Sequence, residues 1–371
     1  MQEGDHMTRG TSMAIWALTP DGTAIAATIA AKFPGATIFT GKTIPSPPVG
    51  ARRFTVLAEA VGREFKHFEA HVFVMAVGIV VRMIAPHIGA KQTDPAVVVV
   101  DDTGRFAVSL LSGHSNGANG LAGLIGQFTG AIPVVTTATD NAGVPAIDLL
   151  AKKHALFIEN PEVVKVISMA FLTGQRVWRH DPWKILDTEL KDYTDPKPAM
   201  IDDIASASTP GIFIDHTIDH QIRKFSEKVL VARPRTLAVG SGCNSGTSAD
   251  EIICAVQAVF DQYGLSTSSI LHFVTIEMKT REPGLIEAAA YFNRPLIGFS
   301  KEELSSVKNV PNPSVMVHKH MGVTSVCEAA AILSIHTEIL LVPKQKTKNT
   351  TIAVAEKPYT SLASAQVMRH T

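Results

Sequence analysis

Apolar and polar residues follow three different patterns along the chain. Up to about residue 157, short runs of consecutive apolar residues, such as 71–77 and 96–100, alternate with segments whose apolar residues recur at helical spacing. Runs that are apolar at every position are typical of strands buried on both faces of a parallel sheet. The first pattern therefore predicts an α/β domain with a doubly wound, flavodoxin-like or Rossmann-like sheet.

The pattern changes between about residues 158 and 232. Residues 161–174 have a helical period, whereas 211–218 and 228–234 alternate and predict exposed antiparallel strands. Two tryptophans, several prolines and many Asp and Lys residues also lie in this region. We interpret it as a small α+β connecting domain without an obvious catalytic role.

A second α/β pattern begins at residue 235. Residues 236–248 predict a strand and a glycine turn, and residues 338–358 predict two strands joined by a Lys-rich hairpin. Helical periods lie between them, at 250–264, 282–292 and 326–335. The expected fold class is thus α/β, with two parallel-sheet-rich α/β domains joined by the small α+β domain. We place the domains at residues 13–157, 158–232 and 233–360, with a tail at 361–371.

Composition and charge exclude several classes of function. The 34 Lys and Arg residues balance 34 Asp and Glu residues, which gives no support to nucleic acid or an anionic membrane as the main partner. The three cysteines form neither a metal-type spacing nor a disulfide framework. No uncharged apolar run approaches the ~20 residues of a membrane helix, and the first dozen residues lack the apolar core of a signal peptide. We therefore expect a cytoplasmic protein.

The stretch at residues 110–140 concentrates the polar side chains that could carry chemistry. Two predicted strands within it both end in hydroxyl, amide and small residues, which suggests that they form one edge of a binding crevice. The first strand is followed by Ser112, Gly113, His114, Asn116 and Asn119, and the second by Thr136, Thr137, Thr139 and Asp140.

Each of these residues has a chemical and a structural interpretation. His114 is the best general acid or base, because an unperturbed imidazole titrates near pH ~6.5, or it merely braces the loop. Asp140 could orient His114 or serve as a second base, or it could cap a helix or form a turn. Asn116 and Asn119 could donate to an oxyanion or an acetate arm, or form turns. Ser112 is better suited to donating a hydrogen bond or capping a helix than to nucleophilic attack, because no G-x-S-x-G elbow surrounds it.

A second candidate site follows the strand that begins near residue 236. Its glycine turn precedes a helix start and predicts an anion site for a carboxylate or phosphate, formed by Gly240, Gly242, Ser245, Gly246 and Thr247. The third glycine is one place away from the G-x-G-x-x-G spacing, which weakens a dinucleotide interpretation. Lys279 and Glu282 could bind carboxylates and supply a second acid or base, or they could be a surface pair at a helix start.

Three further candidates lie outside these two stretches. Arg82 follows a predicted buried strand and could bind a substrate carboxylate through its guanidinium group, or form a surface salt bridge. His318 and His320 alternate on a predicted strand, where a solvated strand face is the better interpretation than a metal site. No His, Cys, Asp or Glu group has convincing metal spacing, so we expect no metal site.

Several stretches resemble the cobalt-precorrin-5A hydrolase family (CbiG) of the anaerobic cobalamin pathway. The amino-terminal part of the family is similar to FVMAVGIVVRMIAP, KQTDPAVVVVDDTGRFAVSLLSGHSNGAN and IPVVTTATD, and its carboxy-terminal part is similar to LAVGSGCNSGTSADEI, VTIEMKTREPGL and SVCEAAA. These matches cover most of residues 70–355 in the family's order, and the middle region matches by position and length. Ser115 and Asn116 depart from the bulky apolar residue and glycine that the family often has there.

The resemblance implies a hydrolase that opens the δ-lactone of cobalt-precorrin-5A and releases acetaldehyde, giving cobalt-precorrin-5B. It implies a tetrapyrrole substrate, transient contacts with other enzymes of the pathway, and no separate cofactor, since cobalt arrives with the substrate. The expected catalytic residues are His114, Asp140 and Glu282. The expected substrate-binding residues are Arg82, Ser112, Gly113, Asn116, Asn119, Thr136, Thr137, Thr139, Gly242, Ser245, Thr247 and Lys279. The alternatives are a non-catalytic corrinoid carrier or scaffold, and a nucleotide-binding transferase that holds phosphate at residues 240–247.

Overall fold

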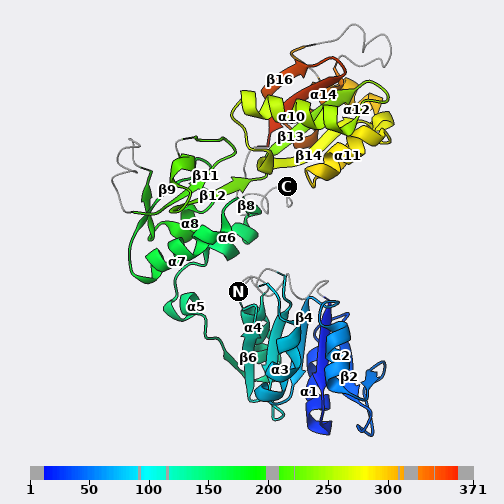
Figure 1. Cartoon of the computed structure of the whole chain (residues 1–371), viewed down its shortest axis with the longest axis vertical. Helices are drawn as coiled ribbons and strands as arrows, with labels where there is room; N and C mark the ends of the chain where they lie inside the picture. The colour runs from blue at the N-terminus through cyan, green and yellow to red at the C-terminus, as the bar shows by residue number, and fades with distance from the viewer. Residues whose placement is uncertain are drawn as a thin grey trace. The chain divides into compact units, whose positions relative to one another are not determined.

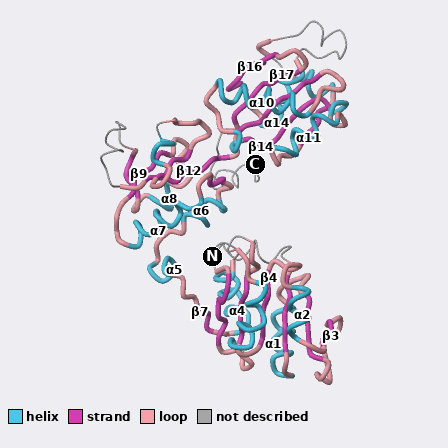
Figure 2. The backbone as a smooth tube through the Cα atoms, viewed as in Figure 1, coloured by secondary structure: helices cyan, strands magenta, loops and turns pink. Residues whose placement is uncertain are grey.

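The computed structural model divides the chain into two compact units, Met1–Leu149 and Leu150–Thr371. It describes residues 12–90, 93–113, 117–197, 209–220, 222–307, 310–312, 325–337 and 339–357. Strands and helices alternate through both units, which confirms the predicted α/β class (Figures 1 and 2). None of the described helices is long and apolar enough to cross a membrane. The division into three domains stays a prediction.

The first unit is built on a seven-stranded sheet of order β3-β2-β1-β4-β5-β6-β7. Its strands are β1 (Met13–Ala17), β2 (Thr37–Gly41), β3 (Arg52–Phe54), β4 (Ala70–Val74), β5 (Ala96–Val100), β6 (Phe106–Leu111) and β7 (Ile132–Val134). The first five strands in this order are parallel, β6 runs antiparallel to β5, and β7 is parallel to β6. The ends of β6 and β7 therefore share one edge of the sheet, opposite the edge where β5 ends.

Helices cover both faces of this sheet. The helices that pack on it are α1 (Pro20–Ala30), α2 (Leu57–Glu64), α3 (Val77–Ile84) and α4 (Ala118–Thr129). The chain also forms η1 (Ala85–His87), α5 (Ala138–Ala142) and α6 (Ile147–Lys153), the last of which spans the boundary between the two units. Ile15 packs with α1 and α4 in one core cluster, whereas its neighbour Trp16 packs with α2 and α3 in the other. This alternation follows the period of two along a strand, and it explains why the central strands are apolar throughout.

A buried polar pair lies in the second of these core clusters. The indole Nε1 of Trp16 donates to Nδ1 of His71 at 3.1 Å, and Nε2 of His71 lies 3.1 Å from the carbonyl oxygen of Phe65. Burial lowers the pKa of His71 to about 4, against a smaller opposing effect of the Phe65 carbonyl. His71 is therefore a neutral core residue. Because the unfolded chain binds this proton more readily, stability is lost as pH falls from about 6.5 toward about 4.

The middle sheet has the order β10-β9-β11-β12-β8. Its strands are β8 (Leu156–Ile158), β9 (Val177–His180), β10 (Thr194–Pro196), β11 (Gly211–Ile214) and β12 (Val229–Pro234), accompanied by η2 (Pro161–Val163), α7 (Val164–Leu172), α8 (Asp187–Leu190) and η3 (Ile222–Phe225). β9, β10, β11 and β12 are parallel to their neighbours, and only β8 is antiparallel.

The prediction of exposed antiparallel strands at 211–218 and 228–234 was therefore wrong. Both strands are buried and they pair in parallel, with Gly211 opposite Val229. The physical reason is that their central residues are apolar on both faces, as expected of strands inside a parallel sheet. The helical prediction for 161–174 is confirmed by η2 and α7.

The third sheet has the order β15-β14-β13-β17-β16. Its strands are β13 (Leu237–Cys243), β14 (Ile270–Ile276), β15 (Leu296–Phe299), β16 (Leu340–Lys346) and β17 (Thr350–Glu356), and its helices are α10 (Ala249–Gln262), η4 (Thr267–Ser269), η5 (Glu277–Lys279), α11 (Pro283–Tyr291), α12 (Lys301–Ser306) and α14 (Val326–Ile335). The antiparallel pair β16–β17 confirms the predicted Lys-rich hairpin. A Cβ atom on Gly240 would collide with the carbonyl oxygen of Cys327, so this glycine lets α14 lie directly on β13.

Two glycines on α4 give a matched test of the packing in the first unit. A Cβ atom on Gly126 would lie 2.6 Å from the carbonyl oxygen of Ala131, whereas one on Gly123 would meet no atom within 4 Å. We expect Gly126→Ala to destabilise the unit by about 1–3 kcal/mol through overpacking. Gly123→Ala should stabilise it by up to about 1 kcal/mol through helix propensity.

Urea unfolding of the two variants, followed by circular dichroism, measures the difference. Equal free energies of unfolding for the two variants would contradict the close approach of α4 to the segment before β7.

Candidate functional site

The two motifs at 112–119 and 136–140 meet at one edge of the first sheet. β7 pairs with β6 in parallel, from Phe106 opposite Ile132 to Val108 opposite Val134. Both motifs follow the carboxyl ends of these strands, so the predicted proximity of the two strand ends is confirmed. The interactions of a single side chain then determine how the motifs are joined.

That side chain is Asn119, in the first turn of α4. Its Oδ1 accepts a hydrogen bond from Oγ of Ser109 at 2.6 Å. Its Nδ2 donates to Oγ1 of Thr137 at 2.9 Å and to Oδ2 of Asp140 at 2.6 Å. Both amide hydrogens are thus used within the protein. In this structure Asn119 connects the two motifs, and its predicted contact with substrate stays a prediction.

Gly113 and Ser112 close the loop before α4. A Cβ atom on Gly113 would collide with Oδ1 of Asn119, so only glycine fits beside the amide. The Ser112 hydroxyl is buried and donates to the carbonyl oxygen of Asp94 at 3.1 Å. The carbonyls of Ser112 and Gly113 accept from the N–H groups of Ala118 and Asn119. The Ser112 contact agrees with a hydrogen-bond donor better than with a nucleophile.

The second motif forms the start of α5. Thr137 is the residue before this short helix, and Asp140 lies in its first turn. Thr136 and Asp140 are exposed, whereas Thr139 is buried. His114 and Asn116 lie outside the described residues, as do His318 and His320. The predicted pairing of Asp140 with His114 therefore stays a prediction.

Arg82 lies apart from these contacts. It is exposed on α3, and its Nη1 donates to the carbonyl oxygen of Gly78, one turn earlier in the same helix, at 2.8 Å. An exposed guanidinium group on a helix surface remains available to a carboxylate.

The predicted anion site of the second unit is filled by a carboxylate of the chain itself. Oε1 of Glu282 accepts from the backbone N–H of Gly246 at 2.6 Å, and Oε2 accepts from Nζ of Lys279 at 2.9 Å and from Oγ of Ser245 at 3.5 Å. The Gly246 N–H, followed by the Lys279 ammonium, lowers the pKa of Glu282. Glu282 is therefore an ionised anchor between the glycine turn and the start of α11, and a weak proton acceptor at neutral pH.

Tight packing shapes the rest of this turn. A Cβ atom on Gly242 would lie 2.7 Å from Oγ1 of Thr351. The Thr247 hydroxyl donates to the carbonyl oxygen of Asn244 at 2.8 Å and therefore stabilises the turn from within. Burial raises the pKa of the adjacent Cys243 thiol, against the smaller opposing effect of Lys279. Cys243 is thus a protonated, space-filling residue at neutral pH.

No site was predicted in the middle sheet, yet the described part of this sheet holds an open pocket with His180 and Asp215 in its wall. The signal that could have pointed to it is the run DHTIDH at 215–220, which directly follows a buried apolar strand. Within the described ranges, no group of three or more His, Cys, Asp or Glu side chains is placed to hold a metal ion.

Comparison with known proteins identifies related sequences along almost the whole chain. Family models match in order: "Cobalamin synthesis G N-terminal" at residues 59–140, "Cobalamin biosynthesis central region" at 145–234 and "Cobalamin synthesis G C-terminus" at 237–355. The middle region, which resembled the family only by position and length, thus has a matching model of its own.

Curated relatives agree with these matches. A protein of Priestia megaterium named cobalt-precorrin-5A hydrolase is 34% identical over 313 residues, which cover 80% of each chain. A protein of the same name from Salmonella typhimurium is 30% identical and covers 89% of this chain and 93% of its own. Protein CobE of a Sinorhizobium species is 26% identical over 121 residues, which are 32% of this chain and 79% of that protein. With three models in the expected order and relatives that match along most of their length, the chain belongs to the cobalt-precorrin-5A hydrolase (CbiG) family.

Proposed function

We propose that this protein hydrolyses the δ-lactone of cobalt-precorrin-5A and releases acetaldehyde, giving cobalt-precorrin-5B in anaerobic cobalamin biosynthesis. The observation that carries this proposal is the 34% identity, over 80% of both chains, to a protein that bears the name of this reaction. The three family models across residues 59–355 support the same role.

The reaction needs an activated water at the lactone carbonyl and a base that drives loss of the aldehyde. In our proposal His114 and Asp140 relay protons at the edge formed by β6 and β7. Support comes from the 2.6 Å hydrogen bond between Asn119 and Asp140, which ties this carboxylate to an amide that lies against Gly113, the residue before His114 in the sequence. A positioned acid or base of this kind typically contributes 10²–10⁴-fold to a rate.

The acetate and propionate arms of the macrocycle need cationic and hydrogen-bonding partners. We assign this role to the exposed guanidinium of Arg82 and to Lys279, whose ammonium group is shared with Glu282. Polar groups of both motif regions complete the proposed substrate-binding set: Ser112, Gly113, Asn116, Asn119, Thr136, Thr137, Thr139, Gly242, Ser245 and Thr247.

The same proposal covers the cofactor, the partner enzymes and the cellular location of the protein. Cobalt enters as part of the substrate, and no separate organic cofactor is required. Transient contacts with other enzymes of the pathway would transfer the corrinoid. We also propose a cytoplasmic location, in keeping with three cysteines that are all free thiols.

A nucleotide-binding transferase is disfavoured by the glycine turn. The N–H of Gly246 that a phosphate would need already binds the ionised carboxylate of Glu282. A phosphate would have to displace this carboxylate or lie beside it at the cost of like-charge repulsion.

We expect the purified protein to release one acetaldehyde for each cobalt-precorrin-5A consumed. Anaerobic incubation, with acetaldehyde measured by a coupled dehydrogenase and the corrinoid by mass spectrometry, provides the measurement. Heat-denatured protein is the control. A folded protein that binds the corrinoid and releases no acetaldehyde would instead support the carrier alternative.

Asp140→Asn tests the first motif. The amide oxygen can still accept the hydrogen bond from Asn119, so the loop is preserved, but the negative charge is lost. We expect kcat to fall by about 100-fold while KM changes little, in steady-state assays of acetaldehyde release. Asn119→Ala is the companion variant, because it removes the connection to Asp140 and Thr137. Full activity of Asp140→Asn would move the catalytic base away from this edge.

Glu282 is tested by comparing Gln with Ala. An anchor needs a hydrogen-bond acceptor for the Gly246 N–H, which Gln retains and Ala lacks. We expect Glu282→Gln to keep activity within about 5-fold and Glu282→Ala to lose at least about 10-fold, in line with one lost hydrogen bond to a charged group. If the two variants lose activity equally, by 100-fold or more, Glu282 acts as a catalytic acid or base.

A further inference from the structure

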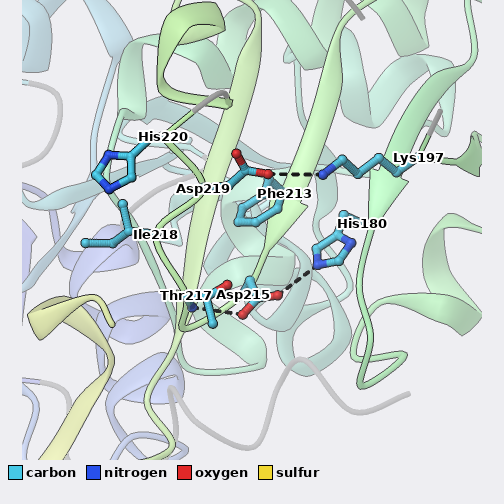
Figure 3. A pocket seen from close by; sticks show the side chains of 8 residues that line it. All are labelled: His180, Lys197, Phe213, Asp215, Thr217, Ile218, Asp219 and His220. Carbon is cyan, nitrogen blue, oxygen red and sulfur yellow. Dashed lines mark hydrogen bonds and ion pairs between the residues drawn. The ribbon is translucent and has the colours of Figure 1, made fainter. Parts of the chain in front are cut away.

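The middle sheet carries an open pocket of about 620 Å³ that belongs to neither motif region (Figure 3). His180 is the last residue of β9, Lys197 directly follows β10, and Asp215 directly follows β11. These three strands are parallel neighbours, so the pocket lies at their carboxyl ends. Open α/β sheets bind ligands at this edge.

A histidine–carboxylate pair lies in the pocket wall. Nε2 of His180 lies 2.8 Å from Oδ2 of Asp215, and Oδ1 of Asp215 accepts from the N–H of Thr217 at 2.8 Å. Burial alone would raise the pKa of Asp215, but the hydrogen bonds from His180 and Thr217 outweigh it and lower the pKa. The ionised carboxylate accepts the Nε2 proton, which leaves the lone pair of the imidazole on Nδ1.

The second ring nitrogen of His180 remains available. Within the described residues, Nδ1 has no hydrogen-bond partner, and 30% of the side chain is exposed. The imidazole stacks on the ring of Phe213, with centroids 4.7 Å apart and planes within 11°. The ring is thus held by a carboxylate on one nitrogen and by an aromatic face, while its other nitrogen is free to take a proton.

A buried arginine fixes the turn that presents Asp215. Arg233 is 2% exposed, and its Nη1 donates to the carbonyl oxygens of Asp215 at 2.8 Å and Thr217 at 2.6 Å. Its Nε lies 2.9 Å from Oε1 of Glu159. Elsewhere in the pocket wall, Nζ of Lys197 donates to Asp219 at 3.2 Å and supplies a cation (Figure 3). The contacts of Arg233 therefore hold the His180–Asp215 pair in place, as a catalytic dyad requires.

We propose that His180 is the base that activates water for lactone opening, with Asp215 as its positioning residue. The inference rests on the proposed function. It assigns one of the two base-dependent steps of that reaction, the activation of water, to the middle sheet. Nδ1 takes a proton as the water oxygen bonds to the carbonyl carbon and the C=O electron pair moves onto oxygen. When that pair returns, the ring C–O bond breaks, and the imidazolium protonates the leaving alkoxide. One water is consumed, and a carboxylic acid and a hydroxyl are formed. The Lys197 ammonium stabilises the transient negative charge.

His180→Ala in the full-length protein is the decisive variant. We expect lactone opening, followed by mass spectrometry of the corrinoid, to slow by at least about 100-fold with KM nearly unchanged. Added imidazole should restore part of the rate, because it can occupy the space beside Phe213. Asp215→Asn should lower kcat without changing KM or the thermal unfolding midpoint, since an amide nitrogen facing Nε2 would impose the wrong tautomer.

His154→Ala is the matched control. Nε2 of His154 lies 2.9 Å from Oε1 of Glu189, so this variant removes another histidine–carboxylate pair of the same unit, outside the pocket. It should retain wild-type activity within about twofold, because no proton transfer is assigned to it.

The outcomes separate this inference from the proposed function. If the wild-type protein turns over and His180→Ala keeps its full rate, the inference is overturned and the proposed function stands. A loss of rate that imidazole does not restore, together with a lowered unfolding midpoint, would make His180 structural. If the wild-type protein releases no acetaldehyde, the proposed function fails and this inference with it.

Discussion

The amide of Asn119 is the interaction on which the first motif region depends. It joins Ser109 on β6, Thr137 before α5 and Asp140 within α5 through three hydrogen bonds. A Cβ atom on Gly113 would collide with this amide, so the residue that precedes His114 is determined by the same contact. A partly buried amide with both hydrogens satisfied tolerates few replacements, since each lost partner leaves a polar group unpaired. The hydrogen bonds of Asn119 thus account for residues in both motifs: Gly113 in SGHSNGAN, and Thr137 and Asp140 in TTATD.

Much of the fold follows from local patterns, whereas strand direction does not. The apolar runs correctly predicted β4 and β5, and the polar residues after β6 and β7 correctly predicted that these strand ends lie together. An apolar run reads the same in either direction, however, and nothing within β6 reveals that it runs antiparallel to β5. The same ambiguity explains the error at β11 and β12, whose parallel pairing depends on the path of residues 215–228 between them. The direction of a strand is set by the segments that connect it to its neighbours in the sheet, and hydrophobic periodicity within the strand does not reveal it.

Contacts between distant residues set a second limit on what the sequence predicts. The glycine turn predicted an anion site for a ligand, whereas in the structure its Gly246 N–H binds the carboxylate of Glu282, which lies 36 residues later in the chain. A pair at a helix start was one of the two interpretations of Lys279 and Glu282, and the pair forms at 2.9 Å. That the same carboxylate also binds a backbone N–H of another loop depends on β13 and β14 being neighbours in the sheet. His180 and Asp215 are 35 residues apart and meet for a comparable reason, through β9 and β11.

Three carboxylates are now candidates for proton chemistry, and their partners distinguish them. Glu282 is bound to the Gly246 N–H and the Lys279 ammonium group, and because both lower its pKa it is an ionised anchor. Asp140 is bound to the amide of Asn119, which cannot relay a proton. Asp215 is bound to the imidazole of His180, whose ring lies in the pocket wall. Of these three carboxylates, Asp215 is the one bound to an imidazole, a group that can both accept and donate a proton. For Asp140, the partner in proton transfer that we propose is His114.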